Sequence, residues 1–227
     1  MSDEPALISR AVLADQVKER LLEDILAGRY PASGRIVETR VARELGTSQA
    51  PVREALRGLE ALGVVEILPF RGARVRRPST SELLDSYAVR AALESLAARL
   101  AVPQLADTDL AELTALVDEM RRSADGGDNH AVATADAAFH ERIVQLAGNA
   151  ALHRAWRSLE PLSRTYLTLV FPGADARWTA GLHPPILEAL RRRDAEEVEK
   201  ALRHHFAEIG AMLGRKWEVA GARPGPD

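Results

Sequence analysis

Apolar residues near the start of the chain recur at the spacing of an amphipathic helix. Four of them are four residues apart and share one helix face: Leu13, Val17, Leu21 and Ile25. This pattern predicts a helix over residues 12–26. Gly28 ends it, because glycine favours the backbone conformation that follows a helix. The first predicted element is therefore an amphipathic helix whose apolar face must pack against another element.

Two shorter helices and a hairpin are predicted next. The first helix covers residues 38–45. Ser48 is a natural N-cap for the second, which tolerates Pro51 in its first turn. The β-branched run at 64–68 and residues 73–76 flank a turn, so they predict two paired strands. Three helices followed by a hairpin define a winged helix-turn-helix.

From residue 82 onward the apolar periodicity is helical. Six helices are predicted, over residues 82–101, 107–123, 129–147, 150–171, 184–193 and 195–217. Ser79 and Glu82 predict a capping box at the first of them. The fold class is mostly α: an N-terminal winged helix-turn-helix and a C-terminal all-α bundle of about six helices. The expected divisions are 1–77 for the first domain, 78–81 for a linker, 82–217 for the bundle and 218–227 for a disordered tail.

Composition limits the class of protein. The 227 residues are 46% hydrophobic and 28% charged, the balance of a globular protein. There is no cysteine, which excludes disulfides and thiolate metal sites. No apolar run is long enough to span a membrane, and the first residues do not resemble a signal peptide. We therefore expect a cytoplasmic protein with no membrane association.

The charge is unevenly distributed, although the net charge is only −3. Residues 35–77 hold nine arginines and five glutamates, whereas residues 78–227 are net acidic. Such asymmetry indicates a basic binding module joined to an acidic domain. A merely solvated arginine-rich face is the alternative.

The second helix of a helix-turn-helix reads the major groove with its N-terminal residues. Here that helix begins Ser48-Gln49-Ala50-Pro51-Val52-Arg53. Glutamine can pair with adenine, arginine can pair with guanine or phosphate, and alanine can pack on a thymine methyl. Arg71 and Gly72 form the tip of the predicted wing, which would lie against the backbone or the minor groove. Double-stranded DNA is therefore the expected partner.

Five segments of this stretch form a recognisable signature. They are ILAGRY (25–30), VARELG (41–46), SQAPVREAL (48–56), LEALGVV (59–65) and RGARV (71–75). With these residues, positions 10 to 77 resemble the GntR family of bacterial transcriptional regulators. That family usually has Ser-Arg-Thr-Pro-Val-Arg where this chain has Gln49 and Ala50, so its half-site is expected to differ. At one position in the preceding helix the family has an arginine, where this chain has Thr39. The neighbouring residue, Arg40, is therefore a further candidate for DNA binding.

A carboxylate and an imidazole share one face of the helix at 129–147. Asp136 and His140 are four residues apart on its apolar stripe, so both are predicted to face the bundle interior. A buried charge without a partner is costly, and a metal ion would compensate it. His183 and His205 also fall on the apolar stripes of their helices.

One aspartate and three histidines suit Zn²⁺, Ni²⁺, Mn²⁺ or Fe²⁺, with Zn²⁺ as the leading candidate. The alternative is a hydrogen-bonded core cluster without metal. Pro184 and Pro185 force a helix to start directly after His183, which could displace it from the site. The other histidines are expected at the surface: His130, His153 and His204.

The second part of the chain carries a further signature. Its pieces are VRAALE (89–94), Asp136-x-x-Phe139-His140-x-x-Ile143, Gly148-Asn149, and His183-x-x-Ile186-Leu187-x-Ala189-Leu190, with Asp194 and His205 downstream. With these, residues 82–212 resemble the FCD ligand-binding domain of the FadR-type branch of the GntR family, in the shorter, VanR-like layout. The resemblance implies that Asp136, His140, His183 and His205 bind a metal beside a small acid.

Three residues are candidates for contact with that acid. Arg90 is predicted to face inward and could pair with a carboxylate, or with Glu94 one turn away. Asn149 either contacts the ligand or caps a helix, and the cap is favoured. Arg164 could line the pocket.

The expected function is a metal-containing transcriptional repressor that responds to a small organic acid. We expect a homodimer, because a two-fold protein reads a palindromic operator with better discrimination than one half-site. One alternative is a metalloenzyme that uses the same Asp/His3 set, although four protein ligands leave few open positions and no enzyme motif accompanies them. The other is a metal-free sensor of an apolar or acyl effector. We expect no enzymatic activity.

Overall fold

The computed structural model describes residues 10–69, 71–165 and 175–221, and their side chains except at 10–11, 162–165 and 215–221. The chain divides into two compact units, Met1–Arg77 and Pro78–Asp227. Each unit has its own apolar core. No helix among the described residues has the length and apolarity needed to cross a membrane.

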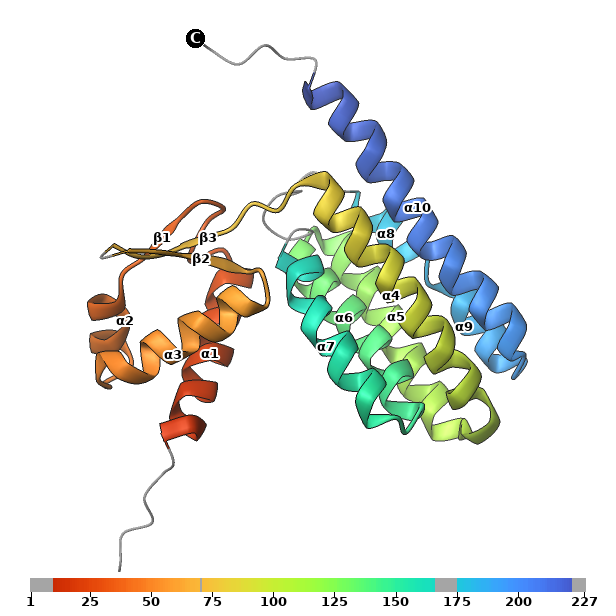
Figure 1. Ribbon diagram of the computed structural model, residues 1–227. Helices are drawn as coiled ribbons and strands as arrows, with labels where there is room; N and C mark the ends of the chain where they lie inside the picture. Colours follow the sequence, from red (N-terminus) through yellow and green to blue (C-terminus); the bar gives the residue numbers. More distant parts are fainter. Residues whose placement is uncertain (1–9, 70, 166–174, 222–227) are drawn as a thin grey trace, which may run out of the picture. The chain divides into compact units, whose positions relative to one another are not determined.

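The first unit is a winged helix-turn-helix (Figure 1). Its elements are α1 (Arg10–Leu26), β1 (Arg35–Ile36), α2 (Glu38–Glu44), α3 (Gln49–Ala61), β2 (Val65–Leu68) and β3 (Gly72–Val75). The sheet order is β1-β3-β2, all antiparallel. The sequence predicted only the hairpin of β2 and β3, because β1 has two residues and no periodicity of its own.

Gly72 is required by the approach of β1. Its φ is +83°, and a Cβ atom there would lie 2.4 Å from the carbonyl oxygen of Ile36. No other residue type fits without a backbone shift. The contact with β1, which comes much earlier in the chain, therefore requires a glycine at the first residue of β3.

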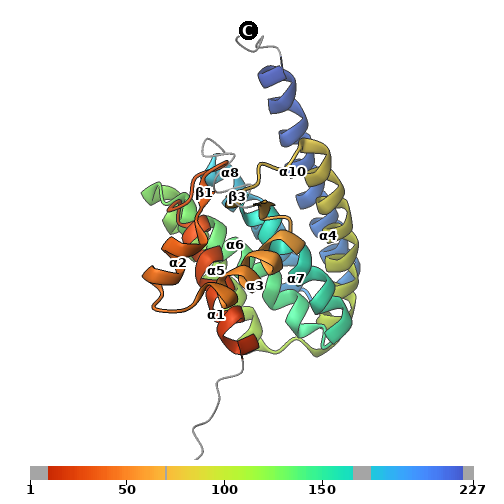
Figure 2. The same ribbon diagram turned by 60° about the vertical axis from the view of Figure 1, so that its left-hand side comes forward.

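The second unit is a helical bundle (Figures 1 and 2). Its elements are α4 (Thr80–Ala101), the 3-10 turn η1 (Val102–Gln104), α5 (Asp107–Gly126), α6 (Asn129–Leu146), α7 (Ala150–Thr165), α8 (Ala176–Gly181), α9 (Pro184–Arg191) and α10 (Ala195–Gly221). Helices α4 and α10 lie side by side in both views. The mostly α fold is confirmed.

Several helix boundaries differ from the expectation. The predicted capping box is present: Ser79 Oγ accepts from the Glu82 backbone N–H, and Glu82 accepts from the Ser79 N–H. Helix α4 thus starts inside the expected linker. Helix α8 was not predicted, because it has only six residues. Helix α10 continues to Gly221, four residues into the expected tail, and residues 222–227 lie outside the described part.

Candidate functional site

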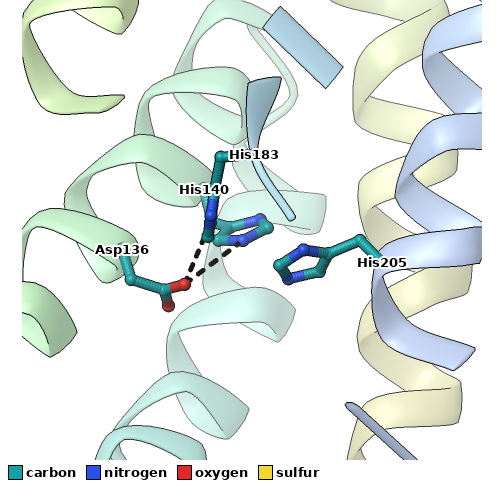
Figure 3. A group of neighbouring side chains, drawn as sticks. All are labelled: Asp136, His140, His183 and His205. Carbon is teal, nitrogen blue, oxygen red and sulfur yellow. Dashed lines mark ion pairs between the residues drawn. The ribbon is translucent and has the colours of Figure 1, made fainter. Parts of the chain in front are cut away.

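Four side chains from three helical segments of the second unit converge in its interior (Figure 3). Asp136 and His140 come from α6, His183 directly precedes α9, and His205 comes from α10. Each offers one ligand atom, and these atoms all lie within 4.8 Å of one another. All four residues are buried. The structure therefore brings together the whole set that the sequence singled out.

The two prolines hold His183 in the cluster rather than displacing it. Pro184 and Pro185 occupy the first turn of α9, where a missing backbone N–H costs nothing. His183 is consequently the N-cap residue, and its side chain is fully buried. Its Nε2 lies 3.0 Å from Asp136 Oδ1.

Hydrogen bonds outside the cluster orient two of the imidazoles. His183 Nδ1 donates to the carbonyl oxygen of Thr179 at 3.1 Å, an atom that can only accept. His140 Nδ1 lies 2.5 Å from Glu94 Oε2 and donates to it. Both Nε2 atoms are thereby left with a free lone pair directed away from these partners.

Each cluster residue has one buried polar atom without a hydrogen-bond partner. These atoms are Asp136 Oδ1, His140 Nε2, His183 Nε2 and His205 Nδ1. Buried polar atoms are nearly always satisfied, so four orphans in one place require an explanation. Three nitrogen lone pairs and a carboxylate oxygen form a donor set that fits a divalent transition metal ion.

Electrostatics in the cluster lower the pKa values of Asp136 and His205. Burial opposes ionisation of Asp136, but the contact with His183 and the charges of the nearby imidazoles outweigh it, and the pKa of this carboxyl lies below its usual range. Burial, reinforced by His183 and His140, lowers the pKa of His205 well below its usual value. Aspartate ionised and histidine neutral are the states in which both bind metal.

Glu94 has more hydrogen-bond partners in the structure than the sequence indicated. It is fully buried on α4 and accepts from three different side chains. Its Oε1 accepts from Arg90 Nη2 at 2.9 Å and from Trp156 Nε1 at 2.6 Å, and its Oε2 accepts from His140. In the sequence, Glu94 falls on the inward-facing stripe of α4. It was interpreted there only as a partner for Arg90.

Arg90 faces inward as expected and forms the salt bridge that the sequence left open. It is buried, with its guanidinium carbon 5.5 Å from the Trp156 ring and 5.2 Å from the Phe206 ring. Two of its N–H groups are bound to Glu94. Its charge is therefore compensated by Glu94 before any ligand arrives.

Asn149 and Arg164 are the two other candidates for contact with an effector. Asn149 is exposed, and its Oδ1 accepts from the backbone N–H groups of Ala151 and Leu152, so it caps α7, as favoured. The side chain of Arg164 lies outside the described residues. His130 and His204 are exposed, and His153 pairs with Glu141 at 3.2 Å away from the cluster.

The predicted DNA-reading residues lie at the start of α3. Ser48 occupies the N-cap position, but its side chain makes no capping hydrogen bond. Ser48, Gln49, Ala50 and Arg53 are exposed. Pro51 is buried in the first turn of the helix, and its part in DNA binding stays a prediction.

Arg53 and Arg40, two exposed arginines of the helix-turn-helix, form salt bridges with nearby glutamates. Arg53 donates to Glu38 Oε2 at 2.6 Å and to Gln49 Oε1 at 3.0 Å. Arg40 donates to Glu44 at 2.7 Å on the surface of α2. Exposed pairs of this kind are weak, so both guanidinium groups remain available to phosphate.

The wing residues are placed at the start of β3. Arg71 is exposed, and its backbone carbonyl accepts from Arg35 Nε at 2.9 Å. Gly72 begins the strand that β1 approaches. A recognition helix and a wing in one unit, and a buried ligand-type cluster in the other, define a DNA-binding regulator with a sensor domain.

Comparison with known families agrees with that class. The description "Bacterial regulatory proteins, gntR family" matches residues 13–75, and "FCD domain" matches residues 85–208. The chain belongs to the GntR family of bacterial transcriptional regulators, in the group that carries an FCD domain.

Individual relatives support the same assignment. The chain is 37% identical over 200 residues to "Probable D-xylose utilization operon transcriptional repressor" from Paenarthrobacter nicotinovorans, covering 88% of each chain. It is 26% identical over 209 residues to "Galactonate operon transcriptional repressor" from Escherichia coli, covering 82% of this chain and 90% of that one. The solved structure "E. coli McbR/YncC" matches its fold with a TM-score of 0.80 at 24% identity, over 90% of this chain and 98% of that chain.

These comparisons decide the general function. The chain is a DNA-binding transcriptional regulator of the GntR family, and several of its relatives are named as repressors. The families and relatives are regulators and not enzymes, which confirms the expectation of no enzymatic activity and excludes the metalloenzyme interpretation.

Proposed function

We propose that this regulator is a repressor that contains a divalent metal ion, binds a palindromic operator as a homodimer and responds to a small organic acid. The observation that carries the proposal is the set of four buried, unsatisfied ligand atoms from Asp136, His140, His183 and His205. Zn²⁺ suits this set best, since three imidazoles and one carboxylate are among its preferred ligands. The ion would supply a positive charge and open coordination positions for an acid.

The operator contacts are proposed for the exposed start of α3 and for the wing. Gln49, Ala50 and Arg53 present their side chains to solvent at the helix N-terminus, with Ser48 at the N-cap position. Arg40 lies on α2, and Arg71 and Gly72 lie at the start of β3 in the wing. Arginines on these elements supply the electrostatic attraction that DNA binding requires.

The nature of the effector follows from the cluster and is consistent with one relative. A metal ion in a buried site binds a carboxylate oxygen directly, and Arg90 is the proposed basic residue near it. Arg164, whose side chain lies outside the described residues, stays a candidate for the same role. One relative is named for a galactonate operon, which is an operon of a sugar acid. Another is named for D-xylose utilization.

The test of the metal site compares two adjacent histidines on α10. His205 lies in the cluster, whereas His204 is exposed. We expect the wild type and His204→Ala to carry about one ion per chain by elemental analysis, and His205→Ala to carry none. His140→Ala is the second variant, in case His205→Ala fails to fold. Metal-free wild type, even after incubation with Zn²⁺ and Ni²⁺, would show that the four residues are a core cluster.

A further inference from the structure

Arg53 connects two side chains that lie on different helices of the helix-turn-helix. Its Nε donates to Glu38 Oε2 at 2.6 Å, and its Nη2 donates to Gln49 Oε1 at 3.0 Å. Glu38 is the first residue of α2, whereas Gln49 and Arg53 are one turn apart at the start of α3. The hydrogen bonds therefore run from Glu38 through Arg53 to the exposed side chain of Gln49.

The contact with Arg53 fixes which way the amide group of Gln49 faces. A guanidinium group has five N–H donors and no acceptor, so only the carbonyl oxygen of Gln49 can face it. The amide nitrogen is consequently turned away from Arg53, and its N–H groups are directed elsewhere. Glu38 and Gln49 together take two of the five N–H groups of Arg53, which leaves three for a base or a phosphate.

We propose that Glu38 is a positioning residue that sets the base preference of Gln49, and that Gln49 in this arrangement selects guanine instead of adenine. The edge of adenine offers one acceptor and one donor, so a glutamine pairs with it by turning its oxygen and its nitrogen to the base together. With Oε1 held by Arg53, Gln49 presents only N–H groups. Guanine offers two acceptors, N7 and O6, on the same edge. This inference rests on the proposed operator contact of α3.

The pair of Arg53 and Glu38 is better protected from solvent than the other pair on α2. The side chain of Glu38 is 23% exposed, whereas that of Glu44, which pairs with Arg40, is 46% exposed. Partial burial reduces screening by salt, and hydrogen bonds between charged groups are stronger than neutral ones. A carboxylate without its arginine would also face the like charge of the DNA phosphates. Arg53 therefore keeps Glu38 as a partner on DNA and contacts the DNA with its remaining N–H groups.

The test first locates the base pair that Gln49 contacts. The full-length wild type and Gln49→Ala each select binding sites from a pool of randomised DNA duplexes. The position at which the wild type prefers one base pair and Gln49→Ala does not is the position of Gln49. Duplexes that differ only at this position are then titrated by fluorescence anisotropy, and the ratio of the Kd values for guanine and adenine is compared between variants.

The wild type should bind the guanine duplex about tenfold more tightly than the adenine duplex, which is in the range of one base contact. Glu38→Ala releases Arg53 and with it Gln49 Oε1, so the ratio should shift toward adenine by about tenfold. Arg53→Met removes the donor itself and should cause the same shift, which provides a second variant in case Glu38→Ala alters α2.

Glu44→Ala is the matched control. It removes the same charge from the same helix, but Glu44 is bound to Arg40 and not to Arg53. Loss of a negative charge near DNA raises the affinity for every duplex, so both glutamate variants share this effect. The ratio of two Kd values within one protein is independent of it, and Glu44→Ala should keep the wild-type ratio.

Three results would overturn the positioning role of Glu38: a wild-type preference for adenine at this position, a ratio that Glu38→Ala leaves unchanged, or an equal shift in Glu44→Ala. The proposed operator contact fails in a different way. Gln49→Ala would then select the same sites as the wild type, or the wild type would enrich no sequence from the pool. Either of these two results is visible in the selection, before any ratio is measured, and overturns the base preference as well.

Discussion

His140 and Glu94 meet inside the bundle with Nδ1 and Oε2 2.5 Å apart, although 46 residues separate them in the chain. The contact joins α6 to α4 and fixes the ring of His140, so that its other nitrogen belongs to the cluster. Trp156 holds the second oxygen of the same carboxylate from α7. Three helices thus determine the orientation of one candidate ligand.

Removing the charge of Glu94 should weaken metal binding without changing any ligand. We expect Glu94→Gln to lower the affinity for Zn²⁺ by about tenfold, because partners of ligating histidines typically contribute factors of this size. Competition with a chromophoric chelator measures the affinity. Glu141→Gln is the control, since Glu141 pairs with His153 outside the cluster. Equal affinities for the two variants would show that Glu94 does not position His140.

The metal-free protein should lose stability as the pH falls below about 6.5. The pKa of His205 is lowered in the folded state by burial and by His183 and His140, so the unfolded chain takes up a proton that the folded chain resists. Stability is complete above the unfolded pKa and decreases below it, by up to about 1.4 kcal/mol per pH unit.

The pH dependence has a window that separates His205 from the two buried carboxylates. Asp136 and Glu94 also have lowered pKa values, but their contribution is lost only below their ordinary values of 3.8 and 4.5. Urea unfolding of chelator-treated protein between pH 5 and pH 7 measures the slope, with pH limits set roughly around the ordinary pKa of histidine. The slope should flatten in His205→Gln and persist in His204→Gln. A slope retained in His205→Gln would contradict the assignment.

Two glycines with positive φ should respond differently to alanine. Gly28 has φ +78° with no atom within 4 Å of an added Cβ, whereas Gly72 has φ +83° with the Ile36 carbonyl oxygen at 2.4 Å. Both Gly→Ala variants should lose about 1 kcal/mol from the left-handed backbone alone. Gly72→Ala should lose clearly more, because the wing must also move away from β1. Urea unfolding monitored by circular dichroism provides the comparison; similar losses would indicate that β1 shifts freely.

Arg53→Ala should weaken operator binding in a salt-dependent way. If Arg53 contacts a phosphate, its loss lowers affinity across all sequences and reduces the salt slope by about 1. If it contacts a base, affinity falls by about 1–3 kcal/mol and specificity at one position relaxes. Gel-shift titrations at several salt concentrations separate the two cases. Arg203→Ala on α10, where Arg203 pairs with Glu199, should leave binding unchanged.

The winged helix-turn-helix could be predicted because its elements are marked locally. The four-residue repeat of α1 and the β-branched run of β2 each depend on neighbours in sequence. Strand β1 could not be predicted, since two residues have no periodicity and form a strand only by pairing with β3. Helix α8 was not predicted either, because its six residues are too few to show a helical periodicity.

The candidate ligands were predictable one by one, but their assembly was not. Helical spacing alone placed Asp136 and His140 on one inward face, and the sequence put His183 and His205 on apolar stripes. Only the packing of α6, α9 and α10 decided that their ligand atoms converge within 4.8 Å. The pairing of Glu94 with His140 depends on the distance between α4 and α6, which no local pattern encodes. The salt bridge of Glu94 with Arg90, in contrast, joins residues one turn apart on α4, and the sequence already offered it as an alternative. Periodicity fixes which face of a helix is buried, whereas tertiary packing decides what that face meets.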